Sequence, residues 1–170
     1  MIEEHDHEYR TGIGTDIHEL VSDRKLMLGG VYIEHPRGLA GHSDGDVVIH
    51  AVVDALLGAA GLSDIGTLFP DTDPKWKDTD SKEFLAVARE LLEEKRWVIV
   101  NIDVTIHAEE PRLESYKMQM KRCIASLLGL DFEAMNVKAK TNEGFGDVGA
   151  GDAIAATAIA LIKRKYKRTL

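Results

Sequence analysis

The stretch Val98–His107 restricts the fold most, because its side chains alternate between apolar and polar. The apolar residues are Val100, Ile102, Val104 and Ile106, and the polar ones are Asn101, Asp103, Thr105 and His107. A period of two places each kind of residue on its own face of a β-strand. The segment therefore predicts a strand with one buried face, and with it a sheet that covers a core.

The segments around this strand predict further elements in a regular order. We expect strands over residues 9–18, 26–33 and 136–141, and helices over residues 44–60, 81–95, 113–128 and 152–165. The last helix is predicted from its many alanines, which have the highest helix propensity. This order predicts an α/β fold of the α+β type, in which a mixed β-sheet is layered with α-helices.

Length and composition restrict the class of protein. The 170 residues suit a single domain over residues 1–170, with residues 1–8 as a disordered N-terminal extension. No apolar run approaches the roughly 20 residues of a spanning helix, so we expect no membrane partner. The net charge of −8 disfavours a nucleic-acid partner. The single cysteine, Cys123, fits a reducing compartment: the bacterial cytoplasm, or the plastid stroma if a transit peptide was removed.

An acidic protein needs metal ions or a few basic groups to bind an anionic substrate, so metal ligands are the first candidates. Asp16 and His18 lie two residues apart at the end of a predicted strand. Side chains at i and i+2 share one face of a strand, so a carboxylate and an imidazole are presented together. Taken alone, such a pair is more often an ordinary surface pair.

Three ionisable residues, Asp46, His50 and Asp54, repeat every four positions along the first predicted helix and so share one stripe. The stripe is either solvated or functional. In the functional case His50 ligates a metal, and Asp46 or Asp54 orients its ring. Asp16, His18 and His50 would then leave one coordination position open, as in catalytic zinc sites.

Three further segments carry side chains that could bind a substrate. Ser43, three residues before Asp46, resembles a capping box, and His42 before it is an alternative metal ligand or a phosphate contact. Residues 64–74 interleave Asp with Gly and Pro, which suits the binding of hydroxyls. Residues 138–144 carry Lys, Thr and Glu into a glycine loop, which suits a phosphate with a divalent cation. From the residues alone, an Asx-turn loop and a solvated edge strand are the better explanations of these two segments.

Together these segments resemble the 2-C-methyl-D-erythritol 2,4-cyclodiphosphate synthase family of the non-mevalonate (MEP) isoprenoid pathway. The resemblance runs from Tyr9 to Lys163 in the family's order and spacing. Its motifs are Gly14-Thr15-Asp16-Ile17-His18, the run 39–61 with His42-Ser43-Asp44-Gly45-Asp46, Asp64-Ile65-Gly66, Leu68-Phe69-Pro70-Asp71-Thr72-Asp73-Pro74, Asn101-Ile102-Asp103-Val104-Thr105-Ile106, and residues 136–143. Several long motifs that agree at once argue against a chance match.

The resemblance implies a homotrimer with each active site between neighbouring subunits. It implies conversion of 4-diphosphocytidyl-2-C-methyl-D-erythritol 2-phosphate into the cyclic diphosphate with release of CMP. Asp16, His18 and His50 would hold a zinc-type ion, and Glu143 would hold Mg²⁺ or Mn²⁺ together with the substrate diphosphate. The substrate's own phosphate is the nucleophile, so catalysis requires positioning and charge neutralisation rather than a nucleophilic side chain.

The resemblance also implies contacts with the substrate. Catalytic roles would fall to His42, Thr141 and Asp64. The erythritol phosphate and hydroxyls would meet Asp16, His18, His42, Ser43, Asp64, Ile65, Gly66 and Asp71; the diphosphate would meet Ala139, Lys140, Thr141 and Glu143; and the cytidine would meet Ala108, Pro111, Arg112 and Leu113.

Two positions depart from the family pattern. Lys140 stands where the family often has Thr, which adds a basic group beside the diphosphate. Ala150-Gly151-Asp152 stands where bacterial members often carry Arg-x-Glu near the trimer axis, so isoprenoid diphosphate binding in a central cavity is not carried over. Two other functions remain as alternatives: a zinc-dependent phosphohydrolase with an acyclic product, and a non-catalytic trimer with a structural metal.

Overall fold

The structure, a computed structural model, describes residues 7–165. Within them the main sheet has five strands in the order β4-β1-β7-β5-β6. Its strands are β1 (His7–Ser22), β4 (Arg37–Leu39), β5 (Val98–His107), β6 (Met135–Lys140) and β7 (Ala153–Lys165). The β5–β6 pair is parallel and the other pairs are antiparallel. A separate hairpin joins β2 (Leu26–Leu28) to β3 (Val31–Ile33).

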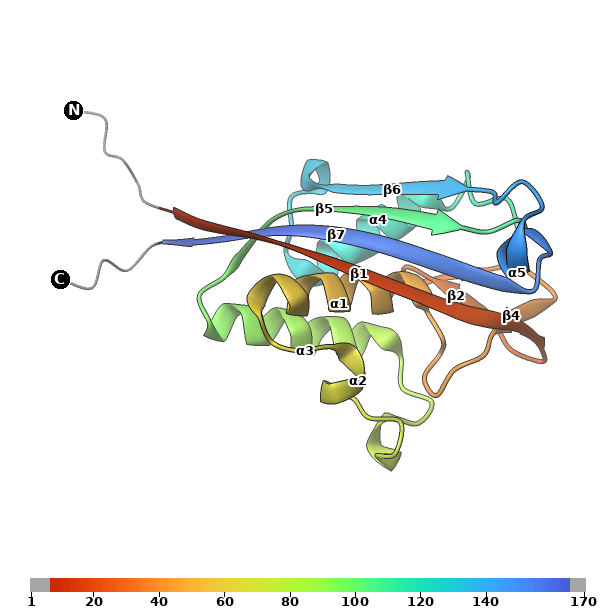
Figure 1. The fold of residues 1–170 in the computed structure, drawn as a ribbon, viewed down its shortest axis with the longest axis horizontal. Coiled ribbons are helices and arrows are strands. Elements are labelled where there is room, and N and C mark those ends of the chain that lie inside the picture. Colours follow the sequence, from red (N-terminus) through yellow and green to blue (C-terminus); the bar gives the residue numbers. More distant parts are fainter. Residues whose placement is uncertain (1–6, 166–170) are drawn as a thin grey trace.

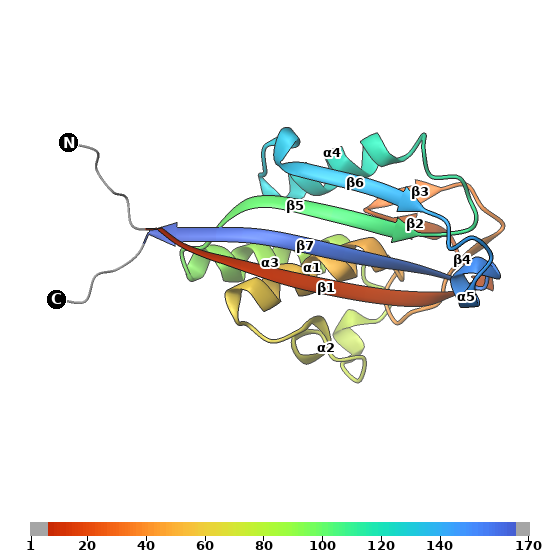
Figure 2. The ribbon, with the colours of Figure 1, turned by 45° about the horizontal axis from the view of Figure 1, so that its top comes forward.

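The long helices lie on one face of this sheet, as Figures 1 and 2 show. They are α1 (Val47–Ala60), α3 (Ser81–Glu94) and α4 (Lys117–Leu128). The short elements are α2 (Ile65–Leu68), α5 (Gly146–Gly149) and the 3-10 turns η1 (Pro74–Trp76) and η2 (Phe132–Ala134). This arrangement confirms the predicted α+β architecture. None of the helices in the described part of the chain is long and apolar enough to cross a membrane.

The opposite face of the sheet is bare within residues 7–165 and carries large apolar side chains. Tyr9, Ile13 and Ile17 on β1 and Ile159 on β7 each keep at least 50% of their surface exposed. Ile13 pairs directly with Ile159, so these side chains form one apolar patch on the sheet. A single chain leaves this patch in water.

The prediction of an alanine-rich helix over residues 152–165 is wrong, because this segment forms β7 at the centre of the sheet. Its buried side chains are Ile154, Ala156, Ala158, Ala160 and Ile162, which alternate with more exposed ones. That period of two belongs to a strand. Hydrogen bonding to β1 on one side and β5 on the other outweighs the helix propensity of alanine.

Other predicted elements are confirmed with shifted ends. The strand Val98–His107 is found as predicted, and α3 ends one residue earlier than predicted. β1 extends to Ser22, and its first residues, His7 and Glu8, belonged to the predicted extension; residues 1–6 lie outside the described residues. The predicted strand over 26–33 is a hairpin, and α1 and α4 begin at Val47 and Lys117.

Two glycines of β1 allow α1 to lie against the strand backbone. A Cβ built on Gly12 would lie 2.1 Å from the carbonyl oxygen of Ala55, and one on Gly14 would lie 2.0 Å from that of Ala51. No side chain fits at these distances, so only glycine permits this contact. The close approach brings the first turns of α1 beside Asp16 on β1.

The β1–β7 ribbon, the pair of strands β1 and β7, packs against the ring of Trp97 at the end that carries the start of β1 and the end of β7. Trp97 is 3% exposed, and the guanidinium carbons of Arg10 and Arg164 lie 4.9 Å and 4.2 Å from its ring centroid. Glu8 accepts hydrogen bonds from both arginines. Both guanidinium groups therefore lie over the indole ring, and one carboxylate links them.

Candidate metal centre

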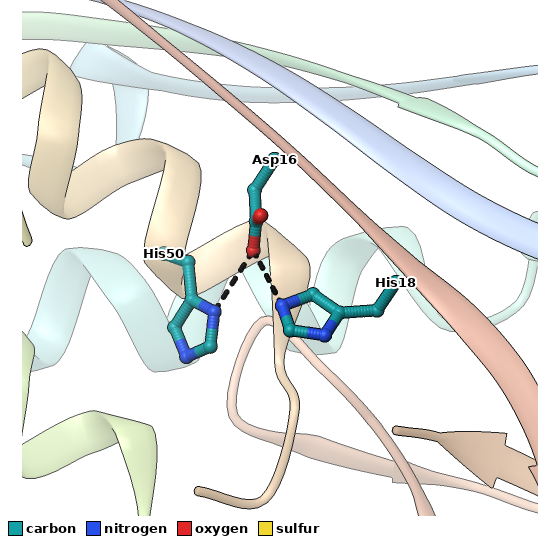
Figure 3. Close-up of side chains that lie close together, drawn as sticks. All are labelled: Asp16, His18 and His50. Atoms are coloured by element: carbon teal, nitrogen blue, oxygen red, sulfur yellow. Dashed lines mark hydrogen bonds and ion pairs between the residues drawn. The ribbon is translucent and has the colours of Figure 1, made fainter. Parts of the chain in front are cut away.

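Asp16, His18 and His50 meet where β1 passes the start of α1 (Figure 3). The Asp16 Oδ2 atom lies 2.9 Å from His18 Nε2 and 2.9 Å from His50 Nδ1. One potential ligand atom from each residue lies within 4.8 Å of the others. One carboxylate and two imidazoles at this separation suit a divalent transition metal. The predicted grouping of the three residues is confirmed.

Asp16 and His18 point toward α1 because they continue the face of β1 on which Gly12 and Gly14 lie. The Nδ1 atom of His18 is hydrogen-bonded to the carbonyl oxygen of Ala40. A carbonyl only accepts, so Nδ1 carries a proton, and Nε2 is the atom that would bind a metal.

The ionisation of the cluster reflects its internal hydrogen bonds. Burial raises the pKa of Asp16, but hydrogen bonds from His18 and His50 hold this pKa well below its ordinary value. Burial lowers the pKa of His18, but the hydrogen bond with Asp16 raises it above the ordinary value of 6.5. In the absence of a metal, Asp16 and His18 therefore stabilise each other's charged forms.

The expected orienting role of Asp46 or Asp54 toward His50 is wrong. Asp46 is the N-cap of α1, and its buried carboxylate accepts N–H bonds from Gly29, Gly30, Val48 and Ile49. Asp54 accepts the N–H of Ile65 at 2.7 Å, which ties α2 to α1. A carboxylate with several backbone donors suits the positive end of the helix dipole, so Asp46 serves the fold.

The side chains that orient His50 are two serines. His50 Nε2 lies 2.9 Å from Ser81 Oγ and 3.2 Å from Ser43 Oγ. Ser81 was not predicted, because it opens α3, 31 positions after His50, and only the fold joins them. The predicted capping box is also wrong, since Ser43 lies outside α1 and bonds to His50 instead.

A pocket of about 280 Å³ opens onto the cluster. It is lined by Asp16, His18, Gly41, His42, Ser43, His50, Ile65, Gly66, Phe69, Asp71, Trp76 and Phe84. The ring of Phe69 packs on Trp76 and Phe84, with centroids 4.9 Å and 4.5 Å away, and forms an apolar wall that was not predicted. His42 Nε2 is buried and has no hydrogen-bond partner among the described residues. An unpaired buried nitrogen at a pocket wall suits a polar ligand.

Asp64 lies just outside this lining. Its carboxylate accepts the N–H of Thr67 at 2.8 Å and caps α2, whose first residues, Ile65 and Gly66, do line the pocket. The predicted sugar-binding segment therefore borders the metal ligands, with its aspartate on the exposed rim.

The second predicted group lies elsewhere, past the C-terminal ends of the parallel strands β5 and β6. Thr141 donates to Glu143 Oε1 at 2.8 Å, and the Ala108 N–H donates to the Lys140 carbonyl at 3.0 Å. The pocket lining includes none of the predicted residues Ala108, Pro111, Arg112, Leu113, Ala139, Lys140, Thr141 and Glu143. Asp16 and Ala139 are three strands apart, about 14 Å at the usual strand spacing, so one chain keeps the two groups separate.

Comparison with known proteins identifies this arrangement. The profile of the YgbB family matches residues 9–163. The chain belongs to the YgbB family. Curated relatives include the 2-C-methyl-D-erythritol 2,4-cyclodiphosphate synthases of Bordetella avium, 49% identical over 157 residues (92% of this chain, 97% of the relative), and of Alkaliphilus oremlandii, 51% identical over 153 residues (90% and 98%).

Solved structures agree with this assignment. The bifunctional IspDF of Campylobacter jejuni is 42% identical with a TM-score of 0.90, over 97% of this chain and 44% of that longer chain. The CDP complex of IspF from Plasmodium falciparum is 36% identical with a TM-score of 0.82, over 93% and 97%. The resemblance seen in the sequence motifs is confirmed.

In this YgbB-family chain, Asp16, His50 and Ser81 also have the spacing of a Ser-His-Asp triad, with both hydrogen bonds at 2.9 Å. Ser81 is fully buried, however, and its hydroxyl donates to Asp44. A nucleophilic serine must be reached by its substrate and must lose its proton to histidine. Ser81 meets neither condition, so the geometry supports metal binding rather than acyl transfer.

Proposed function

We propose that this protein is a 2-C-methyl-D-erythritol 2,4-cyclodiphosphate synthase of the MEP pathway of isoprenoid biosynthesis. Its substrate is 4-diphosphocytidyl-2-C-methyl-D-erythritol 2-phosphate, and its products are the cyclic diphosphate and CMP. The observation that carries the proposal is the meeting of Asp16, His18 and His50 in one pocket of a chain about half identical to synthases of this name.

The reaction forms one phosphorus–oxygen bond and breaks another. An oxygen of the 2-phosphate attacks the β-phosphorus, and the bond from this phosphorus to the CMP oxygen breaks. Asp16, His18 and His50 would hold a zinc-type ion, and Glu143 would hold Mg²⁺ or Mn²⁺. Such ions polarise phosphate oxygens and offset the charge that develops on the leaving group.

The residues of the chain position the reacting groups. His42 and Ser43 hold the erythritol phosphate at the pocket wall, and Asp64 with Gly66 holds its hydroxyls. Thr141 and Lys140 bind the diphosphate. Backbone groups of the segment Ala108, Pro111, Arg112 and Leu113 surround the cytidine. The CDP bound to the Plasmodium falciparum relative supports a cytidine nucleotide as part of the ligand.

We propose a homotrimer, because one chain separates the two groups that the reaction needs together. A neighbouring copy that covers the bare sheet face brings its Glu143 group to the Asp16 pocket of the first chain. Ile13→Glu on that face should therefore abolish both assembly and CMP release, measured by light scattering and by turnover. Met118→Glu changes another exposed apolar residue on the helical side and should alter neither. A monomeric wild-type protein with full activity contradicts the assembly.

We also propose that the chain forms a single domain, because one hydrophobic core packs the helices on the main sheet. We place the enzyme in the cytoplasm, where a free thiol such as Cys123 stays reduced.

Phosphorus NMR with the substrate, with and without Zn²⁺ and Mg²⁺, tests the proposed reaction. We expect metal-dependent formation of CMP and a cyclic diphosphate. Asp16→Asn and His50→Ala should abolish it while the trimer persists, and His35→Ala, at a histidine outside the pocket, should retain it. An acyclic product identifies a phosphohydrolase instead, and a protein that unfolds without metal identifies a structural metal site.

A further inference from the structure

We propose that Asp44 and Ser81 are positioning residues that fix the tautomer of His50 and thereby direct its Nδ1 lone pair at the metal. This inference rests on the proposed metal site. It concerns the opposite side of the ring, where His50 Nε2 meets a short chain of hydroxyl and carboxylate groups.

Hydrogen bonds connect His50 through Ser81 to the carboxylate of Asp44. Ser81 Oγ lies 2.9 Å from His50 Nε2, and its hydroxyl donates to Asp44 Oδ1. The Ser81 N–H donates to Asp44 Oδ2 at 3.2 Å, so Asp44 holds both the backbone and the side chain of Ser81. Asp44 is itself held by its N–H bond to the carbonyl of Thr79 at 3.1 Å.

The Asp44 carboxylate determines which group donates in each of these hydrogen bonds. A carboxylate only accepts, so the Ser81 hydroxyl proton points to Asp44. The Ser81 oxygen then presents lone pairs to His50, so Nε2 carries a proton whether or not Asp16 also holds one on Nδ1. Ser43 is compatible with this pattern, because its oxygen accepts the Gly45 N–H at 3.2 Å and its hydroxyl can donate to Ser81 Oγ at 3.3 Å.

The result is an imidazole prepared to ligate a cation. With the proton on Nε2, Nδ1 is the ring atom that can exchange its hydrogen bond to Asp16 for a bond to the metal, whereas the other tautomer would keep its proton on Nδ1. Ser81 is fully buried and His50 is 8% exposed, so bulk water does not replace the serine at Nε2. Asp44 has access to solvent through a separate cavity of about 390 Å³, which Arg24 also lines. Hydrogen-bond partners of this kind typically change metal affinity by about 10–100-fold.

Ser81→Ala and Asp44→Asn test the proposal. Ser81→Ala removes the acceptor, whereas Asp44→Asn keeps an oxygen for the hydroxyl but sets an amide N–H₂ against the Ser81 N–H. We expect Co²⁺ and Zn²⁺ affinity, measured by chelator competition, to fall by about 10–100-fold for Ser81→Ala and about 10-fold for Asp44→Asn. Asp80→Asn is the matched control, because Asp80 precedes Ser81 but accepts the N–H of Lys82 at the exposed start of α3. The metal affinity of the Asp80→Asn protein should stay within about twofold of the wild-type affinity.

Nitrogen-15 NMR of the metal-free protein gives a readout that overall stability does not move. Wild-type His50 should show an Nε2–H that exchanges slowly with water because Ser81 accepts it, and Ser81→Ala should speed this exchange. The proposal is overturned if the folded variants keep the slow exchange of the Nε2–H and bind metal within twofold of wild type. If Ser81→Ala fails to fold, Asp44→Asn decides. If the wild-type protein binds no metal, the metal site is refuted, and the exchange of the His50 Nε2–H still decides whether the serine and carboxylate act as proposed.

Discussion

Replacing Gly14 by alanine should damage both the fold and the metal centre, although glycine has no functional group. The new Cβ would lie 2.0 Å from the carbonyl oxygen of Ala51, 2.6 Å from the nitrogen of Ala55 and 2.9 Å from Cβ of Asp54. Two of these atoms belong to the backbone of α1 and cannot rotate away. The helix must therefore move off the strand.

The size of the movement gives the expected effect. An ordinary contact needs about 3.2 Å or more, so α1 must shift by roughly 1 Å, and overpacking of this kind costs about 1–3 kcal/mol. His50 is adjacent to Ala51 and moves with the helix, away from Asp16, from which it is now 2.9 Å distant. Metal–ligand distances tolerate only about 0.2 Å, so we expect a loss of affinity on the order of 100-fold.

Gly58→Ala is the matched control on the same helix. Its Cβ would find its nearest atom, the carbonyl oxygen of Ile13, at 3.9 Å, which is an ordinary contact. Alanine is favoured over glycine inside a helix by about 0.5–1 kcal/mol, so this variant should be more stable than wild type. Urea unfolding at one protein concentration, with chelator competition for Zn²⁺, measures both quantities. Equal effects of the two substitutions, or unchanged metal binding in Gly14→Ala, would refute the reasoning.

Three further outcomes are expected. Asp46→Asn should lower the free energy of unfolding by about 2–4 kcal/mol, because an amide N–H₂ then faces backbone donors, whereas Asp80→Asn at an exposed cap should change it by less than about 0.5 kcal/mol in urea unfolding. In metal-free protein the raised pKa of His18 stabilises the fold below about pH 6.5. This stabilisation is lost as pH rises through the raised value, so the melting temperature should fall over that range, and Asp16→Asn should remove that fall. Chelation should lower the melting temperature without unfolding the protein, since a metal at 100 times its Kd contributes about 2.7 kcal/mol, and circular dichroism of the chelated protein checks this.

The sequence predicted the elements in which large apolar side chains alternate with polar ones. It failed where the two faces of a strand carry similar residues. Val98–His107 alternates between large apolar and polar side chains and was found as predicted. β7 has the same period, but its buried positions include Ala156, Ala158 and Ala160 and its other face includes Ala155. Alanine on both faces hides the alternation, and pairing with two strands is not visible in a local pattern.

The site divides in the same way. Asp16 and His18 are close in sequence on a strand, so their shared face was predictable. His50 was correctly grouped with them through the resemblance and its helix position. The role of Ser81 was not predictable, because a serine at the start of a helix usually indicates nothing beyond capping. The role given to Asp46 was wrong because its carboxylate accepts N–H bonds from the first turn of α1 and from Gly29 and Gly30, which lie in the β2–β3 turn that the pattern had assigned to a strand.

The positions of the two tryptophans have an optical consequence. The protein has two tryptophans, Trp97 at the far end of the β1–β7 ribbon and Trp76 in the wall of the metal pocket. The fluorescence of these two indoles therefore reports on opposite regions of the molecule. A Trp97→Phe protein would emit from the pocket alone, so occupancy of the site could be followed without a label, and the complementary Trp76→Phe protein would report opening of the ribbon end.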